Sequence, residues 1–231
     1  MAEKLAIDGG PKVRDEPFPA WPALGYEDGT AAAEALRSGH LTQLTGGYVR
    51  DFERAFGEWH RAEECVAMSS GTTAIHAVLA ALDIGPGDEV IVPAHTFIGS
   101  ATPVMHQRAT PVFADVDEHT FCLTADTVRE RVTHRTKAII AVHLNGHPCD
   151  MDPLLALGEE RGIAVIEDAA QALGAVYKDH VAGTMGRAGC FSFWEDKIMT
   201  TGGEGGAILT ADGDLAERLR RIRFLCGLAG D

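Results

Sequence analysis

The chain has 231 residues, enough for one large domain or two small ones with a sizeable core. Its 20 basic and 34 acidic residues give a net charge of −14, which argues against nucleic acid as a partner, because phosphate backbones are bound by clustered Lys and Arg. The five cysteines are odd in number and form no CxxC pair, so neither a disulfide framework nor a metal site is expected, and a reducing cytoplasm fits. The first residues are too polar for a secretory signal, and no run approaches the roughly 18 apolar residues of a membrane span.

Prolines dominate the start of the chain and predict an irregular N-terminal arm over residues 1–27, followed by one large domain over 28–231. Helical spacing is present over 29–38 and 48–60, and apolar segments with strand and helix character then alternate. The predicted strands cover 65–68, 89–92, 111–115, 137–143, 164–167, 189–193 and 207–210, and the predicted helices cover 72–82, 97–106, 125–132, 153–160 and 214–225.

This alternation, with strands rich in Val, Ile and Ala, predicts an α/β fold: a mostly parallel sheet with helices on both faces. Ligands of such folds bind at the carboxyl ends of the strands. Residues that carry chemistry are therefore expected directly after the predicted strands.

The small residues Ser69–Thr73 lie between a predicted strand and a predicted helix. They would let the backbone approach an anion, and the helix N-terminus offers unpaired N–H groups with a partial positive charge. The alternative is simple N-capping by Ser or Thr, which needs no ligand. No GxGxxG or GxxxxGK[ST] pattern occurs, so the fingerprints of dinucleotide and P-loop sites are absent from the sequence.

Lys197 follows the apolar segment 190–193 and precedes the glycine-rich segment 202–206. A lysine held still and partly dehydrated in such a setting becomes an amine nucleophile. Asp168 ends a predicted buried strand, where a carboxylate is costly unless it is paired. A protonated pyridine nitrogen would be a suitable partner, although Asp168 could instead cap a following helix. Together the lysine and the acid suggest pyridoxal phosphate (PLP) chemistry.

Three further residues could contact such a cofactor. Gln171 could donate to a phenolic oxygen, Ser192 could reach a phosphate, and Phe97 could stack on a flat ring. Their alternatives are a solvated Gln, a hydrogen-bonded core Ser and an aromatic packed in the core. The pair His143 and His147 invites a metal hypothesis, but the intervening turn lacks the helical spacing of a zinc site, so no metal is expected.

With these residues placed, the sequence resembles the DegT/DnrJ/EryC1/StrS family of PLP-dependent sugar aminotransferases. The likeness runs from about residue 4 to 225 and is specific, because the order and spacing of many motifs agree. The matching stretches are Ser70–Thr72, Gly85–Pro93, Pro111–Asp117, Arg135–Ile139, Val142–Gly146, Glu167–Ala172, Phe191–Phe193 with Lys197, and Gly203–Gly206.

The resemblance implies a catalytic role for two residues. Lys197 matches the lysine that binds the cofactor covalently, and Asp168 matches the acid that faces the pyridine nitrogen. Relatives that carry His in place of the lysine catalyse dehydration, so Lys197 favours transamination. The other implied cofactor contacts are Gln171 near the 3-hydroxyl, Phe97 on the ring, and Gly71, Thr72 and Ser192 at the phosphate.

For the whole protein, the resemblance implies the large domain of PLP fold type I, with a seven-stranded sheet. It implies transfer of an amino group from glutamate or glutamine to a nucleotide-linked keto-sugar or to a keto-cyclitol, for amino-sugar or secondary-metabolite biosynthesis. A homodimer in the cytoplasm, with neither nucleic acid nor membrane as a partner, is expected. Family members are longer, and their small C-terminal domain has no counterpart here.

Two alternatives stay open at this point. The chain could be a non-catalytic remnant that binds the cofactor or dimerises, with apolar surface left uncovered around Leu219, Ile222, Phe224 and Leu225. It could also be another PLP enzyme of the same fold, such as a desulfurase, although no cysteine has an obvious nucleophilic setting.

Overall fold

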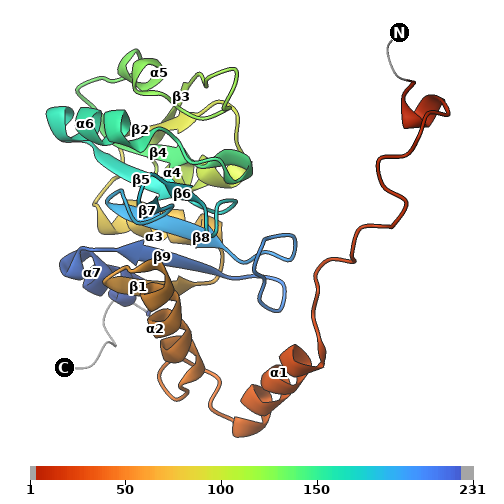
Figure 1. Ribbon diagram of the computed structural model, residues 1–231. Helices are drawn as coiled ribbons and strands as arrows, with labels where there is room; N and C mark the ends of the chain where they lie inside the picture. The colour runs from red at the N-terminus through yellow and green to blue at the C-terminus, as the bar shows by residue number, and fades with distance from the viewer. Residues whose placement is uncertain (1–3, 225–231) are drawn as a thin grey trace. The chain divides into compact units, whose positions relative to one another are not determined.

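The computed structural model describes residues 4–224, and their contacts divide the chain into two units, Met1–Gly39 and His40–Asp231 (Figure 1). The first unit contains the short helix η1 (Ala6–Asp8) and helix α1 (Tyr26–Ser38), and none of its described residues is buried. The helix predicted over 29–38 therefore lies in this first unit.

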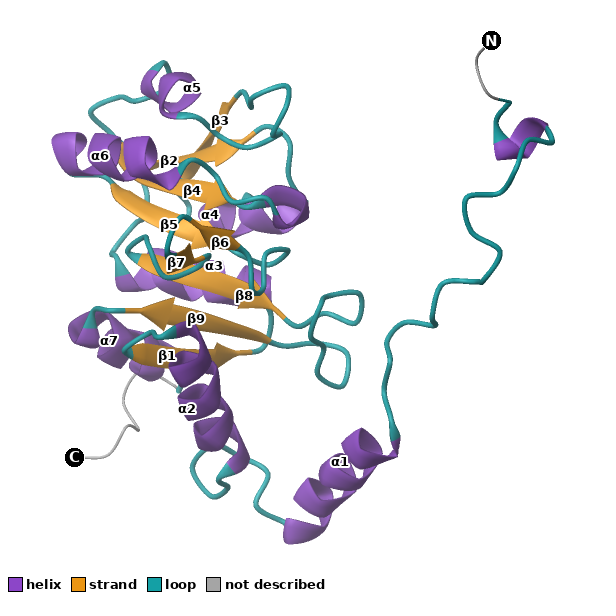
Figure 2. Ribbon diagram, viewed as in Figure 1, coloured by secondary structure: helices purple, strands orange, loops and turns teal. Residues whose placement is uncertain are grey.

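The second unit is built on a seven-stranded sheet with the order β1-β9-β8-β5-β4-β2-β3 (Figure 2). Only β9 is antiparallel to its neighbours, β1 and β8, and the other adjacent strands pair in parallel. The predicted α/β fold with a mostly parallel seven-stranded sheet is thus confirmed. The strands are β1 (Glu64–Met68), β2 (Glu89–Pro93), β3 (Thr110–Ala114), β4 (Thr136–Val142), β5 (Ala164–Asp168), β8 (Ala188–Ser192) and β9 (Gly206–Thr210).

Helices cover both faces of this sheet, as the alternation of buried side chains shows. Cys190 and Ile208 belong to the larger core cluster, which includes α3 and α7, whereas Phe191 and Ala207 pack with Phe56 of α2. Since neighbouring residues of a strand point to opposite faces, α2 lies on the other side of β8 and β9 from α3 and α7. The helices are α2 (Tyr48–His60), α3 (Gly71–Ala81), α4 (Thr102–His106), α5 (Ala125–Arg129), α6 (Met151–Arg161) and α7 (Gly213–Arg223). Within residues 4–224 no helix has the length and apolar character needed to span a membrane.

Some boundaries differ from the prediction. The helix predicted over 97–106 is broken into η2 (Ile98–Ser100) and α4, because Pro103 sits in the first turn of α4, where its missing N–H is tolerated. A two-stranded hairpin, β6 (Val176–Tyr177) and β7 (His180–Val181), was not predicted, because strands this short carry no periodic signal. The last residue of the helix predicted over 214–225, Leu225, lies outside the described residues, as does Cys226.

His60, the last residue of α2, is buried against the rings of Phe56 and Phe191. Its Nδ1–H donates to the carbonyl oxygen of Phe56 at 2.8 Å, and its Nε2 has no partner among residues 4–224. Burial lowers the pKa of this imidazole below its ordinary value of 6.5, because the charged form would lose its hydration.

This burial predicts a pH dependence of stability. The unfolded chain takes up a proton at His60 more readily than the folded chain, so the free energy of unfolding should fall as the pH drops through 6.5. Urea titrations at a series of pH values should show a shallower fall for His60→Phe than for the wild type, while His134→Phe, at an exposed position, keeps the wild-type pH dependence. An equal fall of the free energy of unfolding with pH in all three proteins would contradict this prediction.

Candidate active site

Seven residues singled out in the sequence line one cavity of about 470 Å³ at the carboxyl ends of the strands. These residues lie together because parallel strands end at the same edge of the sheet. Gly71 and Thr72 begin α3 after β1, Phe97 follows β2, Asp168 and Gln171 stand at the end of β5, and Ser192 and Lys197 stand at the end of β8 and in the loop after it.

The start of α3 is capped by the Ser70 side chain, but two of its N–H groups have no helical partner. Ser70 Oγ accepts from the N–H of Thr73 at 3.1 Å, and Thr73 Oγ1 accepts from the N–H of Ser70 at 2.9 Å. Capping by Ser70 is therefore real, yet it leaves the N–H groups of Gly71 and Thr72 without a helical partner. A Cβ on Gly71 would lie 2.8 Å from Ser192 Cβ, so only glycine lets the first turn of α3 approach the end of β8 this closely.

Asp168 is nearly buried, with 6% of its surface exposed. Its Oδ2 accepts from the hydroxyl of Ser100 at 2.7 Å, and its Oδ1 accepts from the N–H of Ala170 at 3.1 Å. The segment after Asp168 forms turns and no helix, so the helix-capping alternative was wrong. Sequence reasoning missed Ser100, which is buried and also hydrogen-bonds Thr96 Oγ1 at 2.8 Å; their i, i+4 spacing just after a strand was the available signal.

The contacts of the neighbouring residues also decide between alternatives. Gln171 Oε1 accepts from the N–H of Asn145 at 2.7 Å, so this side chain is anchored and its amide nitrogen remains to donate. Phe97 is 67% exposed and lines the cavity, so the core-packing alternative was wrong. Ser192 is half-buried, and its Oγ accepts from the N–H of Trp194 at 3.4 Å.

Lys197 is half-buried in the loop that joins β8 to β9. The loop is closed at its base where the N–H of Phe193 donates to Gly205 O at 2.8 Å, and the N–H of Lys197 donates to Trp194 O at 2.9 Å. Two acidic side chains of the same loop line the cavity as well, Asp196 and Glu204, and sequence reasoning singled out neither.

His143, one of the two histidines of the metal hypothesis, is hydrogen-bonded within the protein. His143 Nε2 contacts Glu167 Oε2 at 2.9 Å, and His143 Nδ1 accepts from the N–H of Cys149 at 3.1 Å. Both ring nitrogens are therefore used within the protein. Across residues 4–224 no group of three or more His, Cys, Asp or Glu side chains is arranged to hold a metal ion.

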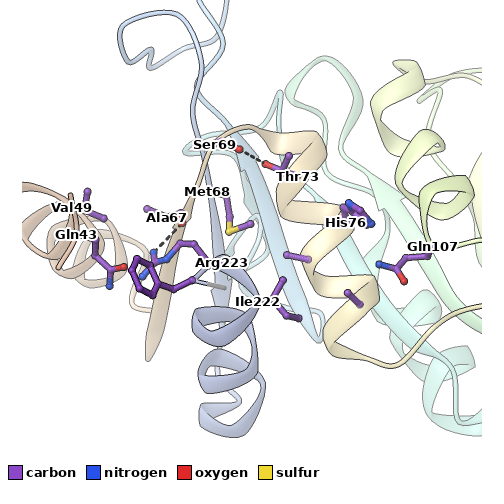
Figure 3. Close-up of a pocket in the computed structure, with 13 residues that line it drawn as sticks. Gln43, Val49, Ala67, Met68, Ser69, Thr73, His76, Gln107, Ile222 and Arg223 are labelled. Atoms are coloured by element: carbon purple, nitrogen blue, oxygen red, sulfur yellow. Dashed lines mark hydrogen bonds between the residues drawn. The ribbon is translucent and has the colours of Figure 1, made fainter. Parts of the chain in front are cut away.

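A larger hollow of about 670 Å³ lies elsewhere, between α2, β1, α3 and α7 (Figure 3). None of the seven residues lines it. Its walls include Ile222 and Phe224, both half-buried, and Arg223, which donates to the carbonyl oxygen of Ala67 at 3.0 Å. Leu219 is fully buried, which corrects the expectation of an uncovered surface there, and Leu225 lies outside the described residues. The polar groups expected for chemistry meet in the smaller cavity, which we take as the candidate active site.

Comparison with known proteins gives a family match over residues 22–230, to the DegT/DnrJ/EryC1/StrS aminotransferase family. The chain is 42% identical over 229 residues to L-glutamine:2-deoxy-scyllo-inosose aminotransferase of Streptomyces lividus, a match over 96% of this chain and 54% of that protein. It is 48% identical over 178 residues to GDP-perosamine synthase of Caulobacter vibrioides, over 77% of this chain and 48% of that protein. Among solved structures, Spr1654 of Streptococcus pneumoniae in its PLP form superposes with a TM-score of 0.82 at 31% identity, over 90% of this chain and 57% of that one. The chain thus spans about half the length of the curated relatives it matches.

The approach of α3 to β8 predicts a test with a matched control. Gly71→Ala should lower the free energy of unfolding by about 1–3 kcal/mol, because the new methyl group must displace Ser192. Gly213 also begins a helix, α7, and has open space around it, so Gly213→Ala should be neutral or slightly stabilising. Urea denaturation measures both changes, and equal effects would mean that α3 and β8 are not in close contact.

Proposed function

Because the chain belongs to the DegT/DnrJ/EryC1/StrS aminotransferase family, we propose that its cavity binds pyridoxal 5′-phosphate and that the protein is a transaminase. The observation that carries the proposal is the meeting of all seven candidate residues, from separate segments of the chain, around one cavity. The solved PLP form of a structural relative supports the choice of cofactor.

The residues present fit this cofactor. Glycine at position 71 lets the first turn of α3 lie next to Ser192, and the N–H groups of Gly71 and Thr72 are suited to a phosphate. Together with the Ser192 hydroxyl they would hold the phosphate end. Asp168 would pair with the pyridine nitrogen, and Phe97 would lie on the ring. Gln171 would donate to the 3-hydroxyl and Lys197 would hold the cofactor covalently.

When bound, the cofactor supplies an electron sink for a carbanion. The protein's own contribution is to orient groups and move protons. Asp168, kept in place by Ser100 and by the Ala170 N–H, presents a fixed negative charge deep in the cavity. The Lys197 amine, on a loop at the cavity wall, is the group proposed to take the proton from the α-carbon of the amino donor and, in the second half of the transfer, to give a proton to the carbon that receives the amino group. Phe97 and Trp194 line the cavity with apolar surface.

We propose glutamine or glutamate as amino donor, and a keto-cyclitol or a keto-sugar, nucleotide-linked in the second case, as acceptor. The support comes from the relatives: one is a glutamine-dependent aminotransferase of a cyclitol and another is a GDP-perosamine synthase. These are activities of proteins about twice as long. A homodimer and a cytoplasmic location belong to the same proposal, and the net charge of −14 supports the expectation of no nucleic-acid partner.

The proposal is tested by trapping the cofactor on the 231-residue chain. Pyridoxal phosphate should give an adduct that borohydride makes permanent, and peptide mass analysis should place it on Lys197. Lys197→Ala should lose the adduct while its circular dichroism and urea midpoint stay as in the wild type. Lys178→Ala, which changes a lysine bonded to Asp152 and outside the cavity, should keep it. An adduct on another lysine, or none, would reject the assignment.

Turnover separates the transaminase from the non-catalytic alternative. Amino transfer from glutamine to 2-deoxy-scyllo-inosose, or to a GDP-linked keto-sugar, should be abolished by Lys197→Ala wherever the wild type shows it. A chain that binds the cofactor at Lys197 yet transfers no amino group, alone or with any product encoded downstream, would favour the non-catalytic alternative.

A further inference from the structure

Glu167 precedes Asp168 on β5 and therefore points to the opposite face of the sheet from the cavity. Neither Glu167 nor His143 has any exposed surface. A fully buried carboxylate is very unfavourable unless hydrogen-bond donors surround it.

The Glu167 carboxylate accepts four hydrogen bonds, two on each oxygen. Oε2 accepts from His143 Nε2 at 2.9 Å and from the N–H of Gly183 at 2.7 Å. Oε1 accepts from the N–H groups of Met185 at 2.7 Å and Gly186 at 2.6 Å. The carboxylate is thus fully satisfied as an anion, and it fixes both His143 and the loop 183–186.

The same contacts define the state of His143. Its Nδ1 accepts from the N–H of Cys149, so the ring proton must lie on Nε2, which donates to Glu167. The imidazole is therefore neutral, and its orientation is fixed from both sides. His143 directly follows β4 and opens the turn η3 (Leu144–Gly146).

This turn leads into the cavity. The N–H of His143 donates to the carbonyl oxygen of Asp168 at 3.1 Å. Two residues later, Asn145 has a positive φ of 54°, a conformation that aims its N–H at Gln171 Oε1, 2.7 Å away. A substitution at Glu167 or His143 is therefore expected to shift the turn whose Asn145 N–H holds Gln171.

The loop 183–186 leads to the cavity by a second route. A Cβ on Gly183 would lie 2.3 Å from the ring of Phe191, and a Cβ on Gly189 would lie 2.1 Å from Gly183 O. The loop is therefore pressed against β8, whose last residue is Ser192. Glu167 holds this loop by three backbone N–H groups.

We propose that Glu167 and His143 are positioning residues of the cofactor cavity, which act from the far face of the sheet by holding the turn that anchors Gln171. The inference rests on the proposed cofactor, because its effect is read in cofactor binding. Neither residue lines the cavity, so neither is a catalytic residue.

The test compares two buried glutamates in the 231-residue chain. Glu167→Gln keeps the shape but replaces two acceptor sites with donors that face N–H groups. Glu89→Gln is the matched control: Glu89 is 4% exposed, accepts from Thr133 and pairs with Arg135, but stands at the amino end of β2, the opposite edge of the sheet. Pyridoxal phosphate affinity is measured by absorbance titration, and stability by urea denaturation.

Glu167→Gln should weaken cofactor affinity about tenfold, the usual scale for residues that orient ligand groups, and should alter the absorbance spectrum of the bound cofactor. Glu89→Gln should stay within about twofold of the wild type even where it costs as much stability. In a Gln171→Ala background most of the effect of Glu167→Gln should disappear, because the turn that Glu167 and His143 hold acts on the cofactor through Gln171.

His143→Ala provides a second variant, with the same expected loss, and His143→Gln should recover part of it by restoring a donor to Glu167. Wild-type affinity in folded Glu167→Gln or His143→Ala would overturn the inference, as would failure of both variants to fold while Glu89→Gln folds. If the wild type itself binds no pyridoxal phosphate, the proposed function fails instead.

Discussion

The carboxylate of Asp168, almost removed from water at the end of β5, is the constraint around which the candidate site is organised. A buried negative charge is tolerated only where donors replace its hydration. The Ser100 hydroxyl and the Ala170 N–H supply two such donors and leave the cavity side of the carboxylate open to a cationic partner. A ligand that carries a positive charge at that point would complete the set. The proposed pyridine nitrogen, once protonated, would be such a partner.

Another part of the same cavity has features suited to an anion. Gly71 brings the first turn of α3 against β8, and Gly71 and Thr72, whose N–H groups have no helical partner, line the cavity. The two parts lie after β1 and at the end of β5, and the sheet helps to keep them at a fixed distance. The hydrogen bonds of Glu167 on the far face tie β4, β5 and the loop before β8 together. The rigidity of the site thus depends on contacts outside the cavity.

Much of this arrangement could be predicted from the sequence, because the strand–helix alternation fixes where each strand ends. Gly71, Asp168 and Lys197 each follow an apolar segment, and a parallel sheet brings such positions to one edge. Ser100 and the role of Glu167 could not be predicted in this way. Their partners are a side chain 68 residues away and backbone N–H groups of a later loop, and neither leaves a periodic pattern. The exposure of the Phe97 side chain could not be predicted either, because it depends on where the helix after this residue breaks.

The strongly acidic composition does not conflict with a phosphate ligand, because the two act over different distances. The charged side chains that sum to −14 are screened from one another and from a ligand beyond about 8 Å at physiological ionic strength, where they are exposed to solvent. The N–H groups at the start of α3 contact a ligand directly, in a cavity where screening by salt is weaker. Asp196 and Glu204 also line this cavity and would repel an anion placed near them. In the proposed function a phosphate would therefore be favoured at the end where Gly71, Thr72 and Ser192 meet, and repulsion from the acidic loop would disfavour the reverse placement.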